Sequence, residues 1–221
     1  MANRVTYDDY SLFIRGERVF IFSGESHLHL LPATDLWLDV FQKTKGLCFN
    51  TVSYYVYWAP LEGEEGVYVA DGIFAFEPFL DAAKQAGIYL LARPGPVSSL
   101  GDTDLYVLQS QHINAEASGG GFPGWLQRIN GQLRTRAPGY LSATDNYITN
   151  TGAIIAKAQV ANGGPIILVQ PEIEVSGAVG AIDGFTDLTY FAYVKQKWYN
   201  AGIIVLLTQK DAWAQGLFAS G

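Results

Sequence analysis

The apolar run from Pro165 to Val169 constrains the fold of this chain more than any other stretch of its sequence. The run is short and bounded by glycine and proline, which is typical of a strand in a parallel sheet covered on both faces. Alternation along such a strand predicts that Gln170, Glu172 and Glu174 share one side. Carboxylates at the carboxyl end of a parallel strand lie where α/β barrels and open α/β sheets place their sites. A pair of ion-paired structural acids would show the same pattern.

Four more apolar runs alternate with four amphipathic stretches along the chain. The predicted strands are 21–25, 49–58, 88–92, 165–169 and 203–207, and the predicted helices are 34–46 (with Thr34 as the N-cap), 74–86, 140–160 and 188–199. Ahead of them, residues 11–20 are predicted to form a β-hairpin about a turn at Gly16. This order predicts an α/β fold with a parallel sheet, either a doubly wound sheet or part of a barrel.

Polar and aromatic residues follow every predicted strand, which favours a barrel with its site at one end of the strands. No G-x-G-x-x-G motif follows the first strand, and this absence argues against a dinucleotide site. The residues that follow the strands are Glu25, His27, Tyr55, Tyr57, Trp58, Asn114, Glu116, Glu174, Asp211 and Trp213.

Charge and composition exclude several classes of partner. The formal net charge is −7 and no basic cluster occurs, so we expect no nucleic acid partner. No apolar run reaches the length of about 18 residues that a membrane span needs, and residues 1–7 predict no signal peptide. Cys48 is the single cysteine, and the three histidines have no metal-site spacing with it. We therefore expect no metal and no cofactor.

Several long motifs occur in a fixed order at 21–25, 36–43, 49–53, 90–96, 113–116, 119–126 and 170–172. Together they resemble the catalytic domain of fungal β-galactosidases of glycoside hydrolase family 35. The resemblance implies a TIM-type (β/α)₈ barrel, of which these residues supply about five units. It also implies hydrolysis of terminal, non-reducing β-D-galactose residues by a retaining mechanism, with one carboxylate as nucleophile and one as acid/base.

The resemblance carries roles to individual residues. Glu174 matches the acid/base that protonates the leaving oxygen and then activates water. Tyr55, Asn114, Ala115 and Glu116 match positions that hold galactose hydroxyls. The family's nucleophilic glutamate belongs to a later strand, which these 221 residues do not contain.

Departures from the family pattern fall at three predicted strand ends. The amide that precedes the acid/base in the family is Ile173 here, and the tyrosine that follows it is Val175. After the first strand, residues 27–30 read His-Leu-His-Leu and lack the family's arginine. After the fifth strand, Gln209 and Lys210 replace two asparagines.

Residues 97–111 form an insertion relative to the family pattern. Either this segment is a translated intron that kept frame, or it is a genuine loop insertion. Its length and its polar residues 102–104 predict a long loop outside the packed core.

Three functional interpretations remain open at this point. The first is part of a β-galactosidase barrel, and the second is a non-catalytic galactoside-binding protein that uses Tyr55, Asn114, Glu116 and Trp213. The third is an inactive fragment.

Family members are usually exported, so the resemblance implies a secreted protein even though these residues show no signal peptide. An unclosed sheet would leave the strand at 203–207 with a free edge, so we expect self-association.

Overall fold

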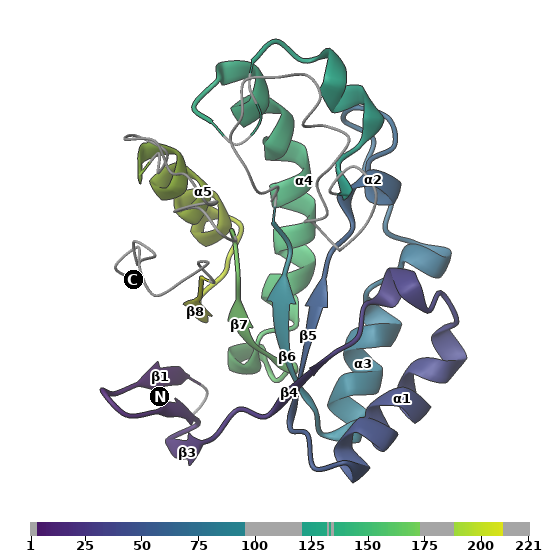
Figure 1. Cartoon of the computed structure of the whole chain (residues 1–221), viewed down its shortest axis with the longest axis vertical. Helices are drawn as coiled ribbons and strands as arrows, with labels where there is room; N and C mark the ends of the chain where they lie inside the picture. The colour runs from purple at the N-terminus through teal and green to yellow at the C-terminus, as the bar shows by residue number, and fades with distance from the viewer. Residues whose placement is uncertain (1–3, 96–120, 132, 134, 173–187, 210–221) are drawn as a thin grey trace, which may run out of the picture.

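The computed structural model describes residues 4–95, 121–131, 133, 135–172 and 188–209, which form two sheets (Figure 1). The larger sheet is parallel, and its strand order is β4-β5-β6-β7-β8, the same as the order along the chain. A doubly wound sheet reverses its strand order at a switch point, whereas a barrel adds strands in sequence. The strand order therefore identifies a partial barrel. The strands are β4 (Ser23–Glu25), β5 (Thr51–Tyr55), β6 (Tyr89–Arg93), β7 (Ile166–Val169) and β8 (Leu206–Leu207).

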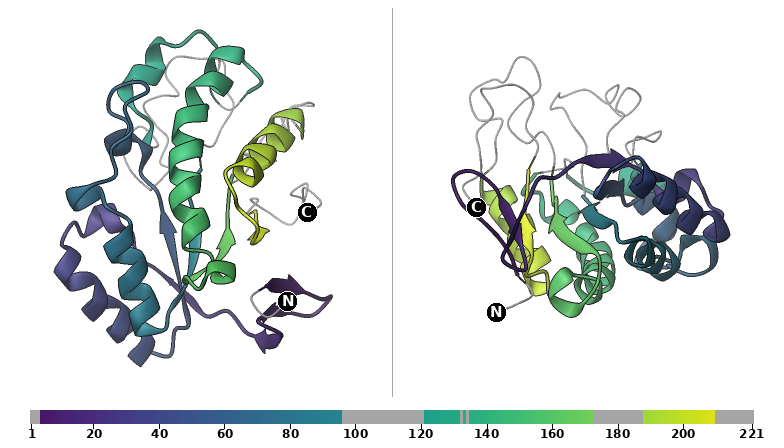
Figure 2. Two further views of the ribbon diagram at one scale, coloured as in Figure 1. Left: turned by 180° about the vertical axis from the view of Figure 1, so that it is seen from behind. Right: turned by 90° about the horizontal axis from the view of Figure 1, so that it is seen from below.

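The helices that connect these strands lie on one face of the curved sheet (Figure 2). The longer ones are α1 (Thr34–Gly46), α3 (Glu77–Ala86), α4 (Pro138–Lys157) and α5 (Leu188–Asn200). Shorter helical turns are α2 (Trp58–Leu61), η1 (Leu28–Leu30), η2 (Gly72–Phe74), η5 (Gly124–Arg128) and η6 (Val160–Asn162). In the part of the chain that the structure describes, no helix has the length and apolar character to cross a membrane.

Aromatic rings hold α1 and α3 against the sheet. Phe79 of α3 lies 5.5 Å from Trp37, 5.0 Å from Phe41 and 5.2 Å from Tyr54, measured between ring centroids. Such tilted and edge-on pairs are the arrangements that aromatic rings prefer in cores. Gly87 ends α3 with a left-handed φ of 71°, as the sequence predicts.

The prediction of Thr34 as N-cap is wrong, because Ala33 occupies that position and makes no side-chain cap. The buried indole of Trp37 donates to the carbonyl of Leu31 at 2.7 Å, and this contact fixes where the chain enters the helix.

Strands β5 and β8 are each at least three residues shorter than predicted, for identifiable reasons, whereas β4 and β7 lack only the first one or two predicted residues. Strand β5 ends at Tyr55, because α2 begins at Trp58. The indole nitrogen of Trp58 donates a hydrogen bond to the carboxylate of Glu62, the residue after this helix, at 2.7 Å. Strand β8 contains only Leu206 and Leu207, because the N–H groups of Ile204 and Val205 donate to the side chain of Gln159 instead of a neighbouring strand.

The smaller sheet is antiparallel and contains β1 (Val5–Tyr7), β2 (Leu12–Ile14) and β3 (Glu17–Val19). The β2–β3 hairpin confirms the predicted one, while β1 is an additional strand. Val5 and Ile14 are buried in the common core, so this sheet packs at the amino ends of the parallel strands (Figure 1). The insertion at 97–111 lies outside the described residues.

Candidate active site

The carboxyl ends of β4, β5 and β6 bring three side chains into direct contact. Arg93 is paired with Tyr55 in the register of β5 and β6, and its guanidinium carbon lies 3.9 Å from the centroid of the Tyr55 ring. The same guanidinium donates through Nη1 to Oε1 of Glu25 at 2.6 Å. The Arg93 side chain is 7% exposed and that of Glu25 is 46% exposed, so the ion pair runs from the protein interior to its surface.

Two histidines extend this group along the turn after β4. Nδ1 of His27 accepts a hydrogen bond from the backbone N–H of Tyr55 at 3.1 Å, which requires that nitrogen to be unprotonated. The His27 ring stacks on His29 with centroids 5.6 Å apart, and His29 contacts Tyr57 edge-on at 5.1 Å. The His27 ring also lies 5.0 Å from the Tyr55 ring, so a continuous row of aromatic rings leads from Tyr57 to Tyr55 and ends on the Arg93 guanidinium.

Residues after β7 turn toward helix α5. Because β7 ends at Val169, the predicted alternation does not extend to Glu172. The Glu172 carboxylate is fully buried and accepts a hydrogen bond from the Tyr190 hydroxyl at 2.6 Å. This contact anchors the chain at Glu172, two residues before Glu174 in the sequence.

Of the residues that sequence reasoning proposed for the strand ends, Glu25, His27, Tyr55 and Tyr57 lie together. Trp58 does not join them, because it is buried and stacks on Tyr147 at 4.7 Å. The remaining predicted positions lie outside the described residues; they are Asn114, Ala115, Glu116, Glu174, Asp211 and Trp213.

Sequence reasoning missed Arg93 as a member of the site, although a charged residue at the end of an apolar strand is a usable signal. It also gave no role to Glu62, a buried residue whose carboxylate accepts three hydrogen bonds. Glu62 accepts from Trp58 Nε1 at 2.7 Å, Asn146 Nδ2 at 2.7 Å and the backbone N–H of Gly66 at 3.0 Å.

Buried tyrosine hydroxyls lie next to the strand ends, and one of them bonds the backbone beside Arg93. The Tyr147 hydroxyl donates to the carbonyl of Pro94 at 2.5 Å, directly after Arg93. Burial raises the pKa of Tyr147 well above its usual value, and burial also raises the pKa of Tyr68 to about 12. Both phenols are therefore neutral at physiological pH, and the Tyr147 hydroxyl keeps the proton that it donates to Pro94.

Among the residues that the structure describes, no group of three histidine, cysteine, aspartate or glutamate side chains could hold a metal ion.

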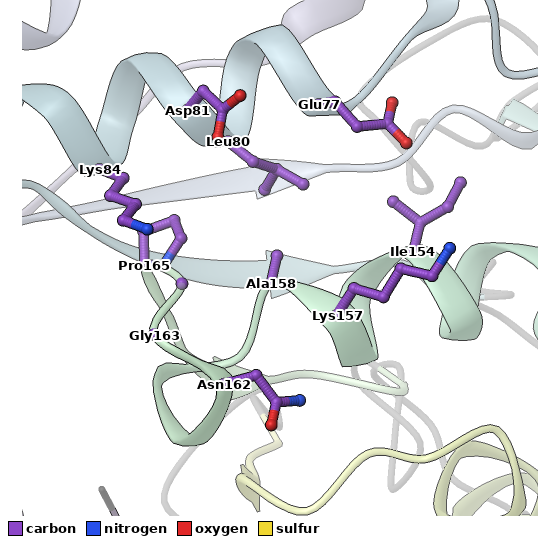
Figure 3. Close-up of a pocket in the computed structure, with 11 residues that line it drawn as sticks. Glu77, Leu80, Asp81, Lys84, Ile154, Lys157, Ala158, Asn162, Gly163 and Pro165 are labelled. Carbon is purple, nitrogen blue, oxygen red and sulfur yellow. The ribbon is translucent and has the colours of Figure 1, made fainter.

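A pocket of about 200 Å³ lies elsewhere, between α3 and the end of α4 (Figure 3). Glu77, Asp81, Lys84 and Lys157 line it, and Pro165 places it at the amino end of β7. It is therefore separate from the strand carboxyl ends.

The chemistry of the strand ends suits a neutral, hydroxyl-rich ligand. Aromatic rings offer faces to the C–H groups of a sugar, while phenol and carboxylate groups offer directional hydrogen bonds to hydroxyls. The Arg93 charge is offset by Glu25, so this ion pair presents no excess positive charge to an anion.

Solved structures with a similar fold include a mannosidase and a galactoceramidase. The exo-β-1,4-mannosidase Op5Man5 from Opitutaceae bacterium strain TAV5 superposes with a TM-score of 0.65 at 15% identity, over 91% of this chain and 34% of that one. An endogalactoceramidase superposes with a TM-score of 0.56 at 16% identity, over 94% of this chain and 53% of that one. The architecture is thus that of part of a (β/α)₈ barrel.

The sequence comparison identifies the family. The model of glycosyl hydrolases family 35 matches residues 11–217, and the chain belongs to that family. It is 58% identical to a protein named "Probable beta-galactosidase A" from Neosartorya fischeri and 54% identical to a "Beta-galactosidase" from Aspergillus niger. Each alignment covers 98% of this chain and 20% of the relative. The chain therefore spans about one fifth of the length of these relatives.

Proposed function

We propose that this chain forms the first part of a β-galactosidase barrel and supplies the half of the active site that binds the galactose unit. The observation that carries the proposal is the family match over residues 11–217, which includes the ends of all five parallel strands. The contacts of Tyr55 support it, because they hold an aromatic hydroxyl-bearing side chain among polar groups at the strand ends.

In the proposed reaction, Glu174 is the acid/base and a glutamate from a later strand is the nucleophile. A retaining mechanism needs the two carboxylates about 5 to 5.5 Å apart, so that one attacks the anomeric carbon while the other protonates the leaving oxygen. The Glu172–Tyr190 hydrogen bond supports this role for Glu174, because it fixes the chain two residues earlier. Tyr55, Asn114, Ala115 and Glu116 would hold the galactose hydroxyls.

A second candidate is galactoside binding without catalysis. Ile173 and Val175 favour it, because they remove the amide and the hydroxyl that flank the acid/base in the family pattern.

Family resemblance also leads us to propose that the protein acts outside the cell, which assay of culture medium and cell lysate with a specific antibody would test.

Calorimetry of the 221-residue polypeptide tests the binding proposal. Galactose should bind, its C4 epimer glucose should bind more weakly, and Tyr55→Phe should weaken galactose binding about tenfold. Equal affinity for both sugars, or no binding of either, would contradict the proposal.

A chromogenic galactoside assay of the same polypeptide should show no turnover, because the proposed nucleophile belongs to a later strand. Turnover that disappears in Glu174→Gln would show that this assignment of the nucleophile is wrong.

A further inference from the structure

We infer that Arg93 is a positioning residue, which holds the Tyr55 ring in the orientation needed to bind the sugar. The inference rests on the proposed function, since Tyr55 is the proposed sugar contact. Three observations carry it: the burial of Arg93, its stacking on Tyr55 and its ion pair with Glu25.

The guanidinium is confined between two partners that belong to different strands. Its carbon lies 3.9 Å from the Tyr55 ring centroid, which is close contact for a planar cation over an aromatic face. Its Nη1 atom is held by Glu25 at 2.6 Å, so the guanidinium cannot move away from the ring without breaking the ion pair. The Tyr55 ring therefore has a fixed surface on one side.

The backbone of Tyr55 is held as well. Its N–H donates to His27 Nδ1, and its position opposite Arg93 is set by the parallel register of β5 and β6. With the backbone fixed, the remaining freedom of Tyr55 is rotation of its side chain, and Arg93 restricts that rotation. A substrate then meets a hydroxyl whose position is already set, so less entropy is lost on binding.

The contact depends on shape as well as charge. A lysine would keep the positive charge beside Glu25, but its compact ammonium group has no plane to stack on the ring. Arg93→Lys therefore separates a positioning role from simple neutralisation of Glu25. The double substitution Arg93→Met with Glu25→Gln removes both charges together, so that neither group is left without its ionic partner.

Arg18 provides a matched control. It also stacks on an aromatic ring, that of Phe13 at 4.7 Å, and it also forms an ion pair, with Asp8 at 3.0 Å. It lies in the small sheet at the amino ends of the strands, away from the site. Arg18→Lys makes the same chemical change without touching Tyr55.

The experiment measures two quantities on the 221-residue polypeptide: the ring resonances of Tyr55 by NMR with labelled tyrosine, and the galactose dissociation constant by calorimetry. Tyr55→Phe assigns the resonances. We expect Arg93→Lys and the double variant to shift the Tyr55 ring resonances and to weaken galactose binding about tenfold. Arg18→Lys should change neither quantity.

Unchanged Tyr55 resonances in folded Arg93→Lys would overturn the inference, and so would unchanged galactose affinity. If the unsubstituted polypeptide binds no galactose, the proposed function fails, and the resonances alone then decide whether Arg93 positions the ring. If Arg93→Lys does not fold, the double variant decides by the same two measurements.

Discussion

The carboxylate of Glu62 accepts a hydrogen bond from the indole nitrogen of Trp58 at 2.7 Å, inside a cluster that joins α2 to α4. Trp58 stacks on Tyr147 of α4, and Asn146 of the same helix donates to Glu62. The backbone carbonyl of Glu62 also accepts from Trp125 Nε1 at 2.7 Å. One buried acid therefore ties together three segments that are distant in sequence.

Replacing Glu62 with alanine should destabilise the protein by roughly 3 kcal/mol or more, because the donors of Trp58, Gly66 and Asn146 would all lose their acceptor. Urea unfolding measures the change. Glu65→Ala, at an exposed position nearby, should alter the free energy of unfolding by less than about 0.5 kcal/mol. Equal losses in the two variants would refute a special role for Glu62.

Gln159→Leu should cost about 2 to 4 kcal/mol and loosen β8. The buried amide of Gln159 donates to the carbonyls of Ala156 and Gly202 and accepts from Ile204 and Val205, so leucine would leave four backbone groups without this partner. Hydrogen exchange at Ile204 and Val205 reports the local effect, and urea unfolding reports the global one.

Asn162→Ala is the control for Gln159, because its exposed amide makes a single bond to the carbonyl of Ala156 at 2.8 Å. It should cost less than about 1 kcal/mol. A comparable loss from Asn162→Ala would mean that the count of buried hydrogen bonds does not explain the stability of this region.

The protein should lose stability at alkaline pH. Burial raises the pKa of Tyr54, Tyr68 and Tyr147, the second of these to about 12. In the unfolded chain these phenols ionise near their ordinary pKa of about 10, so the unfolded state releases protons first as pH rises. Their contribution to stability is complete below about pH 10 and declines as pH rises above 10, through about pH 12 for Tyr68 and further for the other two. Urea unfolding across this range, with tyrosinate absorbance as a second probe, measures the decline.

Tyr54→Phe should make that alkaline loss smaller. The Tyr54 hydroxyl is buried and has no hydrogen-bond partner among the residues described, so its removal should be close to neutral at pH 7. Tyr10→Phe, at a position 88% exposed, should leave the alkaline loss unchanged. If the two variants behave alike, burial of Tyr54 is not a source of the pH dependence.

The polypeptide should self-associate through β8. In the described part of the chain β8 pairs only with β7, and Ile204, two residues before β8, is 70% exposed. Val205 is buried, so a charge is best placed at position 204. Size-exclusion chromatography at matched concentrations should show less association for Ile204→Lys, and a monomeric unsubstituted polypeptide would disprove the prediction.

Deleting residues 97–111 should leave the free energy of unfolding unchanged or raise it. Strand β6 ends at Arg93, before the deletion begins, and a shorter connection loses less entropy on folding. Calorimetric melting of the deletion variant measures the effect. A large drop in melting temperature would place the segment in the core.

The order of elements was predictable because each strand and helix has a local signal, such as the apolar run at 165–169 or Gly87 after α3. Side-chain contacts between distant segments were not. The shortening of β8 depends on Gln159, whose side chain accepts a hydrogen bond from Ile204, 45 residues later in the sequence. The stacking of Arg93 on Tyr55 depends on strand register, which a single sequence does not specify.

The close approach of α4 and α5 has a mechanical consequence. Gly152 leaves no room for a side chain, because a methyl group there would overlap that of Ala201 just beyond the end of α5. Helix α5 also carries Tyr190, which holds Glu172. A helix of 13 residues is a stiff rod roughly 20 Å long, so pushing one end tilts the other. The absence of a side chain at Gly152 thus sets the tilt of α5, and through Tyr190 this tilt sets the position of Glu172, two residues before Glu174 in the sequence.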